Sequence, residues 1–374
     1  MTKIIEQGLA TLAESGNLRQ IPEDATGSGR IDFSSNDYLG IASRSDLQKE
    51  FFELYSPEEL LMSASASRLL ARTQNAFEDF EESLSAAYGR KALIFNSGYH
   101  ANTGLVPALA NNDYTIIADK LVHASIIDGI KLAGVPYERF RHNDLNHLAR
   151  LADKANSQGR KVLIIVESVY SMDGDSSPLE DIVDIKRRYN DALLYVDEAH
   201  AVGVEGPSGL GLTMALGNKA DEVDIVVGTL GKALGSAGAY AMTNSTLRSW
   251  AINKARSFIF STALPPVNML WGRFVFQKSL EMDSERSHLK ALGRRLGNIL
   301  SNGSESHIQP YMLGNPKSAV KMSAELKRQG FDVLPIRTPT VPPGTDRLRL
   351  SLSAALTMEN IEALGEAIRN YRDE

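Results

Sequence analysis

A single lysine, Lys232, lies in the glycine-rich run GTLGKALGSAG at residues 228 to 238, directly after the apolar stretch VDIVV. Short apolar runs that end in glycines are typical of buried strands that lead into tight turns. An ammonium group in such a place loses much of its hydration, and a desolvated lysine amine is a nucleophile toward aldehydes. The position of Lys232 therefore predicts Schiff-base chemistry.

Other polar residues follow apolar runs of the same kind and complete a set of groups suited to pyridoxal phosphate. That cofactor requires a lysine, a carboxylate beside its pyridine nitrogen, donors for its phosphate and a group against its ring face. Asp197 follows LLYV, and Ser97-Gly98-Tyr99 leads into the helix-like segment HANTG, whose first N–H groups suit a phosphate. His123 is placed to cover the ring, His200 to reach its phenolic oxygen, and Thr229 to add a hydroxyl.

Taken singly, each of these residues also has an ordinary structural interpretation. Asp197 alone is more often a helix cap or an ion-pair partner, and Ser97-Gly98 is usually a plain turn between a strand and a helix. Lys232 can extend its amine to solvent from a turn. It is their conjunction at the ends of apolar runs that favours a functional site.

The elements that must position these residues alternate along the chain from about residue 90 to 245. Short apolar runs alternate with segments whose apolar residues recur at helical spacing, which predicts an α/β fold with a mostly parallel sheet and helices on both faces. Ligands of such sheets gather at the carboxyl ends of the strands. The expected strands are ALIFNSG, TIIAD, KVLIIVESV, ALLYVDEAH, VDIVVGTLG and AGAYAMT.

The rest of the chain predicts a second, smaller domain. After a long helix-like segment, the runs FDVLPI and RLRLSLSA and the helical patterns around them indicate a C-terminal α+β domain. We therefore expect an N-terminal arm at residues 1–43, a large cofactor-binding domain at 44–278 and a small domain at 279–374.

Composition excludes several classes of protein. The 374 residues are 43% hydrophobic and carry a formal charge of −6 without any basic block, which argues against nucleic acid and membrane surfaces as partners. There are no cysteines, so disulfides and thiolate metal sites are excluded. With no leader-like start and no long apolar run, we expect a cytoplasmic protein without a membrane span.

Several short motifs do not support the functions with which they are usually associated. DEAH at residues 197 to 200 names a group of nucleic-acid ATPases, but such an enzyme also needs an upstream phosphate loop, which this chain lacks. DGD at 173 to 175 lacks the following ligands of a calcium loop, and neither HExxH nor GxSxG occurs, so no metal is expected. Ordinary surface or core roles are expected for four histidines: His142, His147, His288 and His307.

Longer motifs give the chain a family resemblance. It resembles the α-oxoamine synthases, pyridoxal-phosphate enzymes of fold type I that join an amino acid to an acyl thioester with loss of carbon dioxide. The resemblance covers nearly the whole chain. The segments that carry it are FSSNDYLG at 33 to 40, SGYHAN, DKLVHAS, RHNDLNHLARL, SVYSMDGDSSPL, VDEAH, GTLGKALGSAG, FIFSTALPP and IRTPTVPPGTDRLRLSLSA.

The resemblance implies a role for each cofactor-binding residue. Lys232 forms the Schiff base, Asp197 meets the pyridine nitrogen and His123 stacks on the ring; these three are the expected catalytic residues. Ser171 and His200 approach the phenolic oxygen. Phosphate is bound by Gly98, Tyr99 and Thr229, joined by Thr262 from the partner subunit of a homodimer whose site lies at the interface.

The resemblance also implies substrate contacts. Asn36 and Arg349 would hold the amino-acid carboxylate, where a guanidinium can pair bidentately, and of Arg347 and Arg349 we expect only one to point inward. Arg337 and Thr340, with Arg19 from the N-terminal arm, would reach the acyl chain and its far carboxylate.

Two segments narrow the expected reaction within the family. HNDLNHLARL and RTPTVPPGT favour the condensation of L-alanine with a pimeloyl thioester, on coenzyme A or a carrier protein, to 8-amino-7-oxononanoate in biotin biosynthesis. The alternative is another α-oxoamine synthase such as glycine C-acetyltransferase. The alternatives from other classes are a cofactor-binding regulator that kept the fold without turnover and a nucleic-acid ATPase, which the missing phosphate loop disfavours.

One segment departs from the family pattern. Many members have a glycine-rich stretch where this chain has SASASRLLARTQNAFEDFE, with Ala64, Ala66 and Arg72 where glycines are common and Phe77 where histidine is usual. That segment helps to shape the thioester entrance in the family, so the acyl carrier is the part of the substrate that the resemblance constrains least.

Overall fold

The computed structural model describes residues 2–19, 21, 28–72 and 74–371. The chain divides into two compact units. The large unit comprises residues 39–170 and 175–286, and the small unit comprises residues 1–38, 171–174 and 287–374. The expected division at residues 43 and 278 into an arm and two domains stays a prediction.

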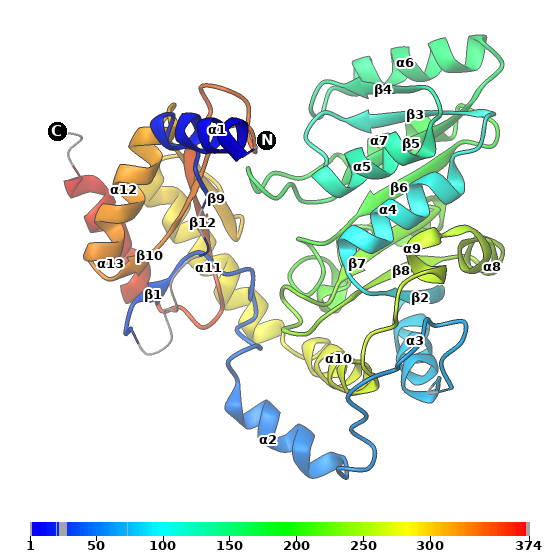
Figure 1. Ribbon diagram of the computed structural model, residues 1–374, viewed down its shortest axis with the longest axis horizontal. Helices are drawn as coiled ribbons and strands as arrows, with labels where there is room; N and C mark the ends of the chain where they lie inside the picture. Colours follow the sequence, from blue (N-terminus) through cyan, green and yellow to red (C-terminus); the bar gives the residue numbers. More distant parts are fainter. Residues whose placement is uncertain (1, 20, 22–27, 73, 372–374) are drawn as a thin grey trace. The chain divides into compact units, whose positions relative to one another are not determined.

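A sheet of seven strands forms the centre of the large unit (Figure 1). Its strand order is β2-β8-β7-β6-β5-β3-β4, and all neighbours are parallel except β8, which runs antiparallel to β2 and β7. The expected mostly parallel sheet is thereby confirmed. The strands are β2 (Lys91–Phe95), β3 (Tyr114–Asp119), β4 (Tyr137–Phe140), β5 (Lys161–Glu167), β6 (Leu193–Asp197), β7 (Ile225–Thr229) and β8 (Ala239–Thr243).

Burial on both faces explains why most of these strands read as continuous apolar runs. In β5 every residue after Lys161 is buried, as parallel strands covered by helices require. The strand that the sequence did not indicate is β4, which is YERF. It is short, lies at the edge of the sheet and buries only Phe140 fully, so it lacks the apolar run that marks its neighbours.

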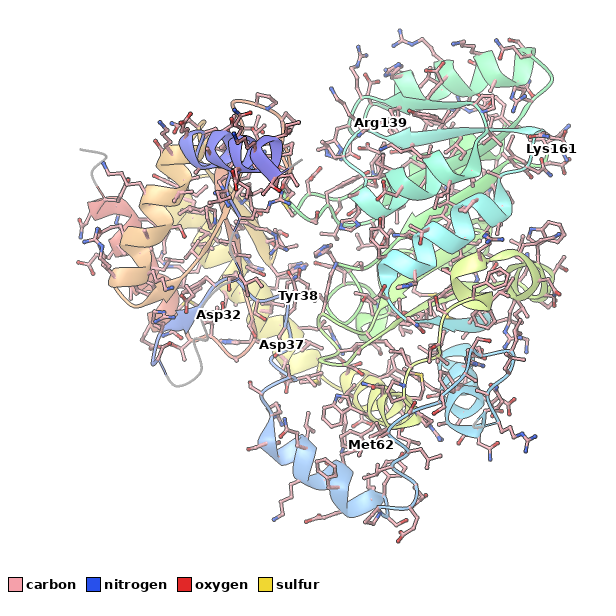
Figure 2. All side chains as sticks on the ribbon, viewed as in Figure 1. Asp32, Asp37, Tyr38, Met62, Arg139 and Lys161 are labelled. Atoms are coloured by element: carbon pink, nitrogen blue, oxygen red, sulfur yellow. The ribbon has the colours of Figure 1, made fainter. Side chains whose placement is uncertain are left out.

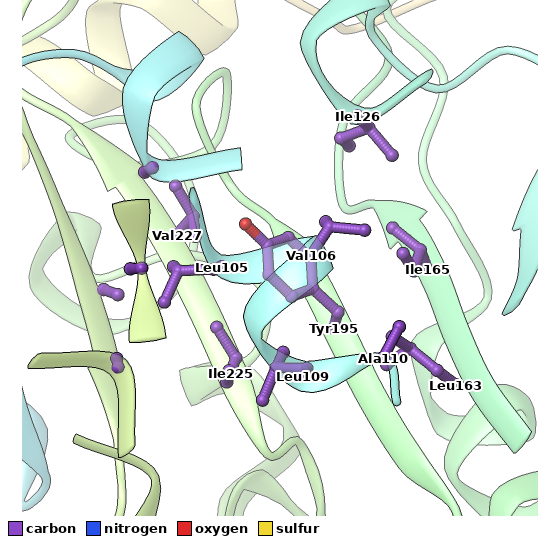
Figure 3. Close-up of a cluster of buried hydrophobic side chains, with 14 of the residues drawn as sticks. Leu105, Val106, Leu109, Ala110, Ile126, Leu163, Ile165, Tyr195, Ile225 and Val227 are labelled. Carbon is purple, nitrogen blue, oxygen red and sulfur yellow. The ribbon is translucent and has the colours of Figure 1, made fainter. Parts of the chain in front are cut away.

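Helices cover both faces of this sheet (Figure 1). On one face, α4 and α5 pack their apolar side chains onto β5, β6 and β7; Figure 3 shows Leu105, Val106 and Leu109 of α4 over Leu163, Tyr195 and Ile225. The helices of the large unit are α2 (Ser45–Leu54), α3 (Asn75–Tyr88), α4 (Gly98–Leu109), α5 (Ala124–Ala133), α6 (Leu145–Ser157), α7 (Leu179–Lys186), η1 (Pro207–Gly209), η2 (Met214–Glu222), α8 (Ser245–Lys254), α9 (Arg256–Ile259) and α10 (Pro266–Ser279).

The small unit is built on a three-stranded antiparallel sheet, β11-β12-β9, and a two-stranded parallel pair, β1-β10. Figure 2 labels Asp32 on β1 and, further along the same segment, Asp37 and Tyr38. Most of the long helix α11 (Asp283–Leu300) belongs to this unit. Its other elements are α1 (Thr2–Glu14), β1 (Ile31–Asp32), β9 (Ile308–Met312), α12 (Pro316–Arg328), β10 (Phe331–Asp332), β11 (Leu334–Ile336), β12 (Arg347–Ser351) and α13 (Met358–Asn370).

Hydrogen bonds hold the segment after β1 along β12. The Ser351 amide donates to Phe33 O at 2.9 Å, and the Ser351 hydroxyl donates to Ser35 O at 2.6 Å. Residues 33–38 therefore have a fixed position beside β12 within the small unit. Among the described residues, no helix is long and apolar enough to cross a membrane.

Candidate active site

Lys232 lies in the loop that joins β7 to the antiparallel strand β8 in the large unit. Backbone hydrogen bonds tighten this loop, with Leu230 N donating to Gly238 O at 2.9 Å and Gly235 N to Lys232 O at 2.9 Å. Gly235 has φ +53°, and a Cβ there would lie 2.8 Å from Ala42 N, so the turn requires glycine. The glycines therefore fix the position of the lysine.

The Lys232 amine contacts a histidine from the next strand of the sheet. Lys232 Nζ lies 2.7 Å from Nε2 of His200, which follows β6 and is buried. At this distance one of the two nitrogens donates to the other. The structure thus brings together two of the predicted cofactor-binding residues.

Asp197 ends β6 as a buried carboxylate that accepts two amide hydrogen bonds. Asn102 Nδ2 donates to its Oδ2 at 2.8 Å, and Ala199 N donates to its Oδ1 at 2.9 Å. Within the described residues the structure gives Asp197 no ion pair. A buried carboxylate that forms no ion pair fits a cationic ring nitrogen, because such a group can pair with it.

Asn102 links Asp197 to His123, although the sequence reasoning did not single it out. The second hydrogen of its Nδ2 goes to Ser125 Oγ at 2.9 Å, and Ser125 Oγ lies 2.7 Å from His123 Nδ1. The Tyr195 hydroxyl donates to Asn102 Oδ1 at 2.5 Å. The sequence shows only an asparagine in the helix-like HANTG segment. Its burial on the inward face of α4 is visible only in the fold.

His123 caps α5 and is held as a neutral ring. Its Nδ1 accepts from Ser125 N at 3.2 Å, which requires an unprotonated nitrogen at that position. Desolvation lowers the pKa of His123. The negative charge of Asp197 raises this pKa, and the positive charge of Lys232 lowers it. A neutral imidazole suits contact with an aromatic ring face.

Glu167 is a second buried carboxyl beside Asp197, and the sequence reasoning missed it. It ends β5 in register with Asp197 on β6, and it accepts the backbone N–H of His123. Burial, and then the charge of Asp197, raise the pKa of Glu167 well above its usual range. The letters VES that contain it read as the end of an apolar strand, so only the strand register reveals the pairing.

The predicted phosphate donors lie at the start of α4. Ser97 is the N-cap, and its hydroxyl accepts from His100 N at 3.2 Å. In the described part of the chain, the N–H groups of Gly98 and Tyr99 have no acceptor, which is the arrangement that binds anions at helix N-termini. Thr229 ends β7 and donates from Oγ1 to Gly238 O at 3.2 Å.

Thr262 is an exposed residue of the large unit. It forms an isolated antiparallel bridge with Ser67, and its carbonyl accepts from Asn96 Nδ2 at 2.6 Å. Its hydroxyl therefore lies on a segment that an adjoining molecule can reach.

Arg349 and Asn36 are in direct contact within the small unit. Arg349 Nη2 donates to Asn36 Oδ1 at 3.0 Å, and Arg349 Nε donates to Ser171 O at 2.6 Å. Arg347 is also buried and donates to the Asp173 carboxylate. The expectation that only one of these arginines points inward is wrong, because residues two apart on a strand share a face.

A pocket of about 370 Å³ in the small unit collects the residues predicted for the acyl chain. Arg19 Nη2 donates to Thr340 Oγ1 at 2.8 Å, and Arg337 Nη1 donates to Gly16 O. Desolvation lowers the pKa of Arg337, and the charge of Arg19 adds to this. The lining residues are Asn17, Arg19, Pro335, Ile336, Arg337, Thr338 and Thr340.

Glu198 of the DEAH sequence is buried within the large unit. Its Oε1 accepts the backbone N–H of Thr213 at 2.6 Å and also the Thr213 hydroxyl. Burial raises the pKa of Glu198 to about 7. These hydrogen bonds hold the loop at Thr213 in place. Such a structural role for Glu198 is consistent with the interpretation that DEAH is not an ATPase motif here.

His142 bridges two carboxylates, a role that its sequence context did not indicate. Its Nδ1 lies 2.9 Å from Asp119 Oδ1 and its Nε2 lies 2.7 Å from Asp175 Oδ2. Burial opposes protonation of His142, but hydrogen bonds to Asp119 and Asp175 outweigh it and raise the pKa to about 10. The imidazolium ties Asp119, the last residue of β3, to Asp175.

Phe77, in the segment that departs from the family pattern, is part of the core. Its ring is buried, and the Arg68 guanidinium lies 4.2 Å from the ring centroid. Arg68 also pairs with the buried Glu81 at 3.0 Å. Phe77 therefore supports the chain near Arg68 through a cation–π contact.

These contacts suit the chemistry of pyridoxal phosphate, which needs an amine, a carboxylate and anion-binding N–H groups near one edge of a sheet. A mostly parallel sheet covered by helices, with those groups after its strands, defines the fold-type I transferases that use this cofactor.

Comparison with known proteins makes the assignment specific. The family model for aminotransferase class I and II matches residues 28–368, so the chain belongs to that family. It is 44% identical over 377 residues to the 8-amino-7-oxononanoate synthase of Chlorobaculum parvum, covering 98% of this chain and 96% of that one. Pyridoxal phosphate is accordingly its cofactor, and the chain is an enzyme of the pyridoxal-phosphate-dependent acyltransferase class.

Two solved structures share the fold. A serine palmitoyltransferase from S. paucimobilis with bound pyridoxal phosphate and myriocin superposes with a TM-score of 0.85 at 27% identity, covering 98% of this chain and 96% of that one. The 8-amino-7-oxononanoate synthase of Francisella tularensis gives a TM-score of 0.74 at 26% identity, covering 91% and 98%.

Proposed function

We propose that this enzyme condenses L-alanine with a pimeloyl thioester, with loss of carbon dioxide, to give 8-amino-7-oxononanoate in biotin biosynthesis. The relatives of that name support the proposal, at 43 to 44% identity over nearly the full chain. The observation that carries it is the pocket lined by Arg19, Arg337 and Thr340.

The charge of this pocket suits a dicarboxylic acyl group. Among the described residues, no carboxylate forms an ion pair with Arg19 or Arg337, so two neighbouring cations face the pocket without an anion. A pimeloyl group ends in a carboxylate, whereas an acetyl or palmitoyl group has none. Guanidinium groups bind carboxylates through charge-assisted hydrogen bonds, so the pocket favours the dicarboxylic acyl chain.

The cofactor would be held by the groups around Lys232. Bound pyridoxal phosphate supplies an electron-withdrawing ring that stabilises negative charge on the α-carbon of an amino acid. Asp197 would pair with the ring nitrogen, His123 would cover the ring, and Ser171 and His200 would approach the phenolic oxygen. The phosphate donors would be Gly98, Tyr99 and Thr229 with Thr262 of the partner subunit.

The chain's own residues would orient the substrate and move its proton. Asn36 and Arg349 would hold the L-alanine carboxylate. Lys232 Nζ would then take the proton from the α-carbon, a step that depends on position more than on basicity. His200, 2.7 Å from this amine, would accept or donate a hydrogen bond as the charge of Lys232 changes.

A homodimer in the cytoplasm is part of the proposal. Large apolar side chains are exposed on two segments that lie together in the large unit, where Ala263 N donates to Ala66 O at 2.9 Å. A second copy of the chain would cover this face and bring its Thr262 to the site. The exposed side chains are Leu61, Met62, Leu69, Leu70 and Phe260.

The experiment compares pimeloyl thioester with its terminal methyl ester, both with L-alanine. The methyl ester removes the far charge without shortening the chain, so the enzyme should prefer the free acid by roughly tenfold or more in kcat/KM. Arg337→Ala and Arg19→Ala should each reduce that preference. Arg328→Ala, at an exposed position on α12, is the matched control and should keep it.

Equal use of both thioesters by the unmodified enzyme would refute the assignment of the pocket. Preferential turnover of glycine with acetyl-CoA would instead assign the chain to glycine C-acetyltransferase, the alternative that the sequence left open.

A further inference from the structure

Three groups of the small unit meet around the side chain of Tyr38. Its hydroxyl donates to Asn36 Oδ1 at 2.9 Å and accepts from Arg349 Nη2 at 3.2 Å. Arg349 Nη2 also donates to the same Asn36 Oδ1 at 3.0 Å. Tyr38, Asn36 and Arg349 therefore form a closed triangle of hydrogen bonds.

The triangle decides which face of the Asn36 amide is available. Asn36 Oδ1 accepts from two donors, the Tyr38 hydroxyl and the Arg349 guanidinium. Turning the amide over would place its NH₂ against a guanidinium that can only donate. The Asn36 NH₂ group is therefore fixed on the side away from Tyr38, where it can donate to another acceptor.

The same contacts decide which nitrogen of Arg349 is available. Its single Nε hydrogen goes to Ser171 O at 2.6 Å, and Nη2 donates to both Asn36 Oδ1 and the Tyr38 hydroxyl. Within the part of the chain that the structure describes, Nη1 is the guanidinium nitrogen left without an acceptor. Both bidentate edges of the guanidinium include Nη2. A carboxylate that leaves these contacts intact would therefore meet Arg349 through Nη1.

Tyr38 itself is held firmly enough to impose this geometry. Its side chain is fully buried, its ring packs edge-on against His307 with centroids 4.3 Å apart, and its carbonyl accepts from Ala354 N at 2.8 Å. Burial raises the pKa of Tyr38 against the opposing charge of Arg349, so its hydroxyl keeps the proton that it donates.

We propose that Tyr38 is a positioning residue for the amino-acid substrate, because its hydroxyl selects the Asn36 NH₂ group and Arg349 Nη1 as the two donors to the substrate's carboxylate. This inference rests on the proposed function of Asn36 and Arg349 as the carboxylate site. It adds that the site is a pair of single hydrogen bonds from two residues, and that its geometry depends on a hydroxyl that never touches the substrate.

The test is the variant Tyr38→Phe, which removes the hydroxyl and keeps the ring. Binding of L-alanine and of L-alaninamide is titrated on the cofactor-loaded enzyme without thioester, and unfolding of the cofactor-free protein is measured separately. L-alanine binding should weaken roughly three- to tenfold, the worth of a neutral hydrogen bond. L-alaninamide lacks the carboxylate, so its binding should change by less than about twofold.

A matched control is Tyr240→Phe, which also removes a buried tyrosine hydroxyl. Tyr240 lies in the large unit and bonds to the Tyr88 hydroxyl at 2.7 Å. The Tyr240→Phe variant should keep the wild-type preference for L-alanine over L-alaninamide. If Tyr38→Phe weakens both ligands equally, or weakens neither, the positioning role is refuted even when the cofactor-free variant unfolds like the wild type.

A second pair of variants separates this inference from the proposed function. Arg349→Ala and Asn36→Ala should abolish the preference for L-alanine over the amide. If they leave it intact, the carboxylate site itself is wrong. If they abolish it and Tyr38→Phe retains it, the site is right and only the role of Tyr38 is wrong.

Discussion

Glu167 and Asp197 stand opposite one another on the adjacent parallel strands β5 and β6, both buried. Two neighbouring buried carboxylates repel one another and lose hydration, so the pair favours a state with one proton. Asp197 accepts two amide hydrogen bonds, whereas Glu167 accepts one from the His123 backbone. Burial, and then the charge of Asp197, raise the pKa of Glu167, so the protonated form of Glu167 is favoured.

Replacing Glu167 by glutamine should raise stability at neutral pH. The folded-state pKa of Glu167 is raised above its ordinary value of 4.5. The contribution of Glu167 to the free energy of unfolding is therefore complete below about pH 4.5, and it is lost as pH rises toward the folded-state pKa. Glu167→Gln is neutral at every pH and still accepts from His123 N. The gain in free energy of unfolding of the cofactor-free variant over the wild type should grow as pH rises from 4.5 to 8, measured by urea unfolding.

Glu281→Gln, at an exposed position after α10, provides the control for loss of a carboxyl group. It should show no comparable pH-dependent gain. If the free energy of unfolding of Glu167→Gln instead falls below that of the wild type as pH rises, Glu167 is ionised in the folded state.

Removing the Asn102 amide should weaken both the fold and the cofactor site. Asn102→Ala leaves the Tyr195 hydroxyl and Asp197 each without one hydrogen-bond partner, and both are buried. We expect a loss of about 1 to 3 kcal/mol in free energy of unfolding of the cofactor-free protein. Affinity for pyridoxal phosphate should also fall, as equilibrium dialysis would show.

Asn253→Ala is the matched amide control, because among the described residues Asn253 donates only to Ser249 O, on the exposed side of α8. The free energy of unfolding and the affinity for pyridoxal phosphate of Asn253→Ala should stay near the wild-type values. Unchanged stability and unchanged cofactor affinity in Asn102→Ala would rule out the network from Asp197 to His123.

His142 should stabilise the protein in a pH-dependent way. Its folded-state pKa of about 10 lies above its ordinary value of 6.5, so its contribution is complete below about pH 6.5 and is lost as pH rises through about 10. The difference in free energy of unfolding between wild type and His142→Gln should therefore be largest near pH 6 and decline toward pH 10. A constant difference over that range would mean that His142 is neutral between Asp119 and Asp175.

The sequence predicted the parts of this protein that local patterns determine. Lys232, Asp197 and His200 each follow an apolar strand, and that pattern is readable without coordinates. The apolar alternation also predicted the sheet, apart from the short edge strand β4.

The residues that the sequence missed depend on contacts between distant elements. Glu167 matters because strand register sets it beside Asp197, and Asn102 because α4 packs its inward face over β6. Tyr38 matters because residues 33–38 lie beside β12, more than 300 residues later in the chain. Neither the register nor these packings leave a periodic signal in the letters.

Thiol release from an acyl thioester is the decisive assay of the proposed reaction. Purified enzyme loaded with pyridoxal phosphate is given L-alanine or glycine together with a pimeloyl, acetyl or palmitoyl thioester, and the product is identified by mass. We expect release with L-alanine and pimeloyl thioester, at a rate well above every other pair, and a product of the mass of 8-amino-7-oxononanoate. Faster release with another pair, or thiol release that does not require the amino acid, would contradict it.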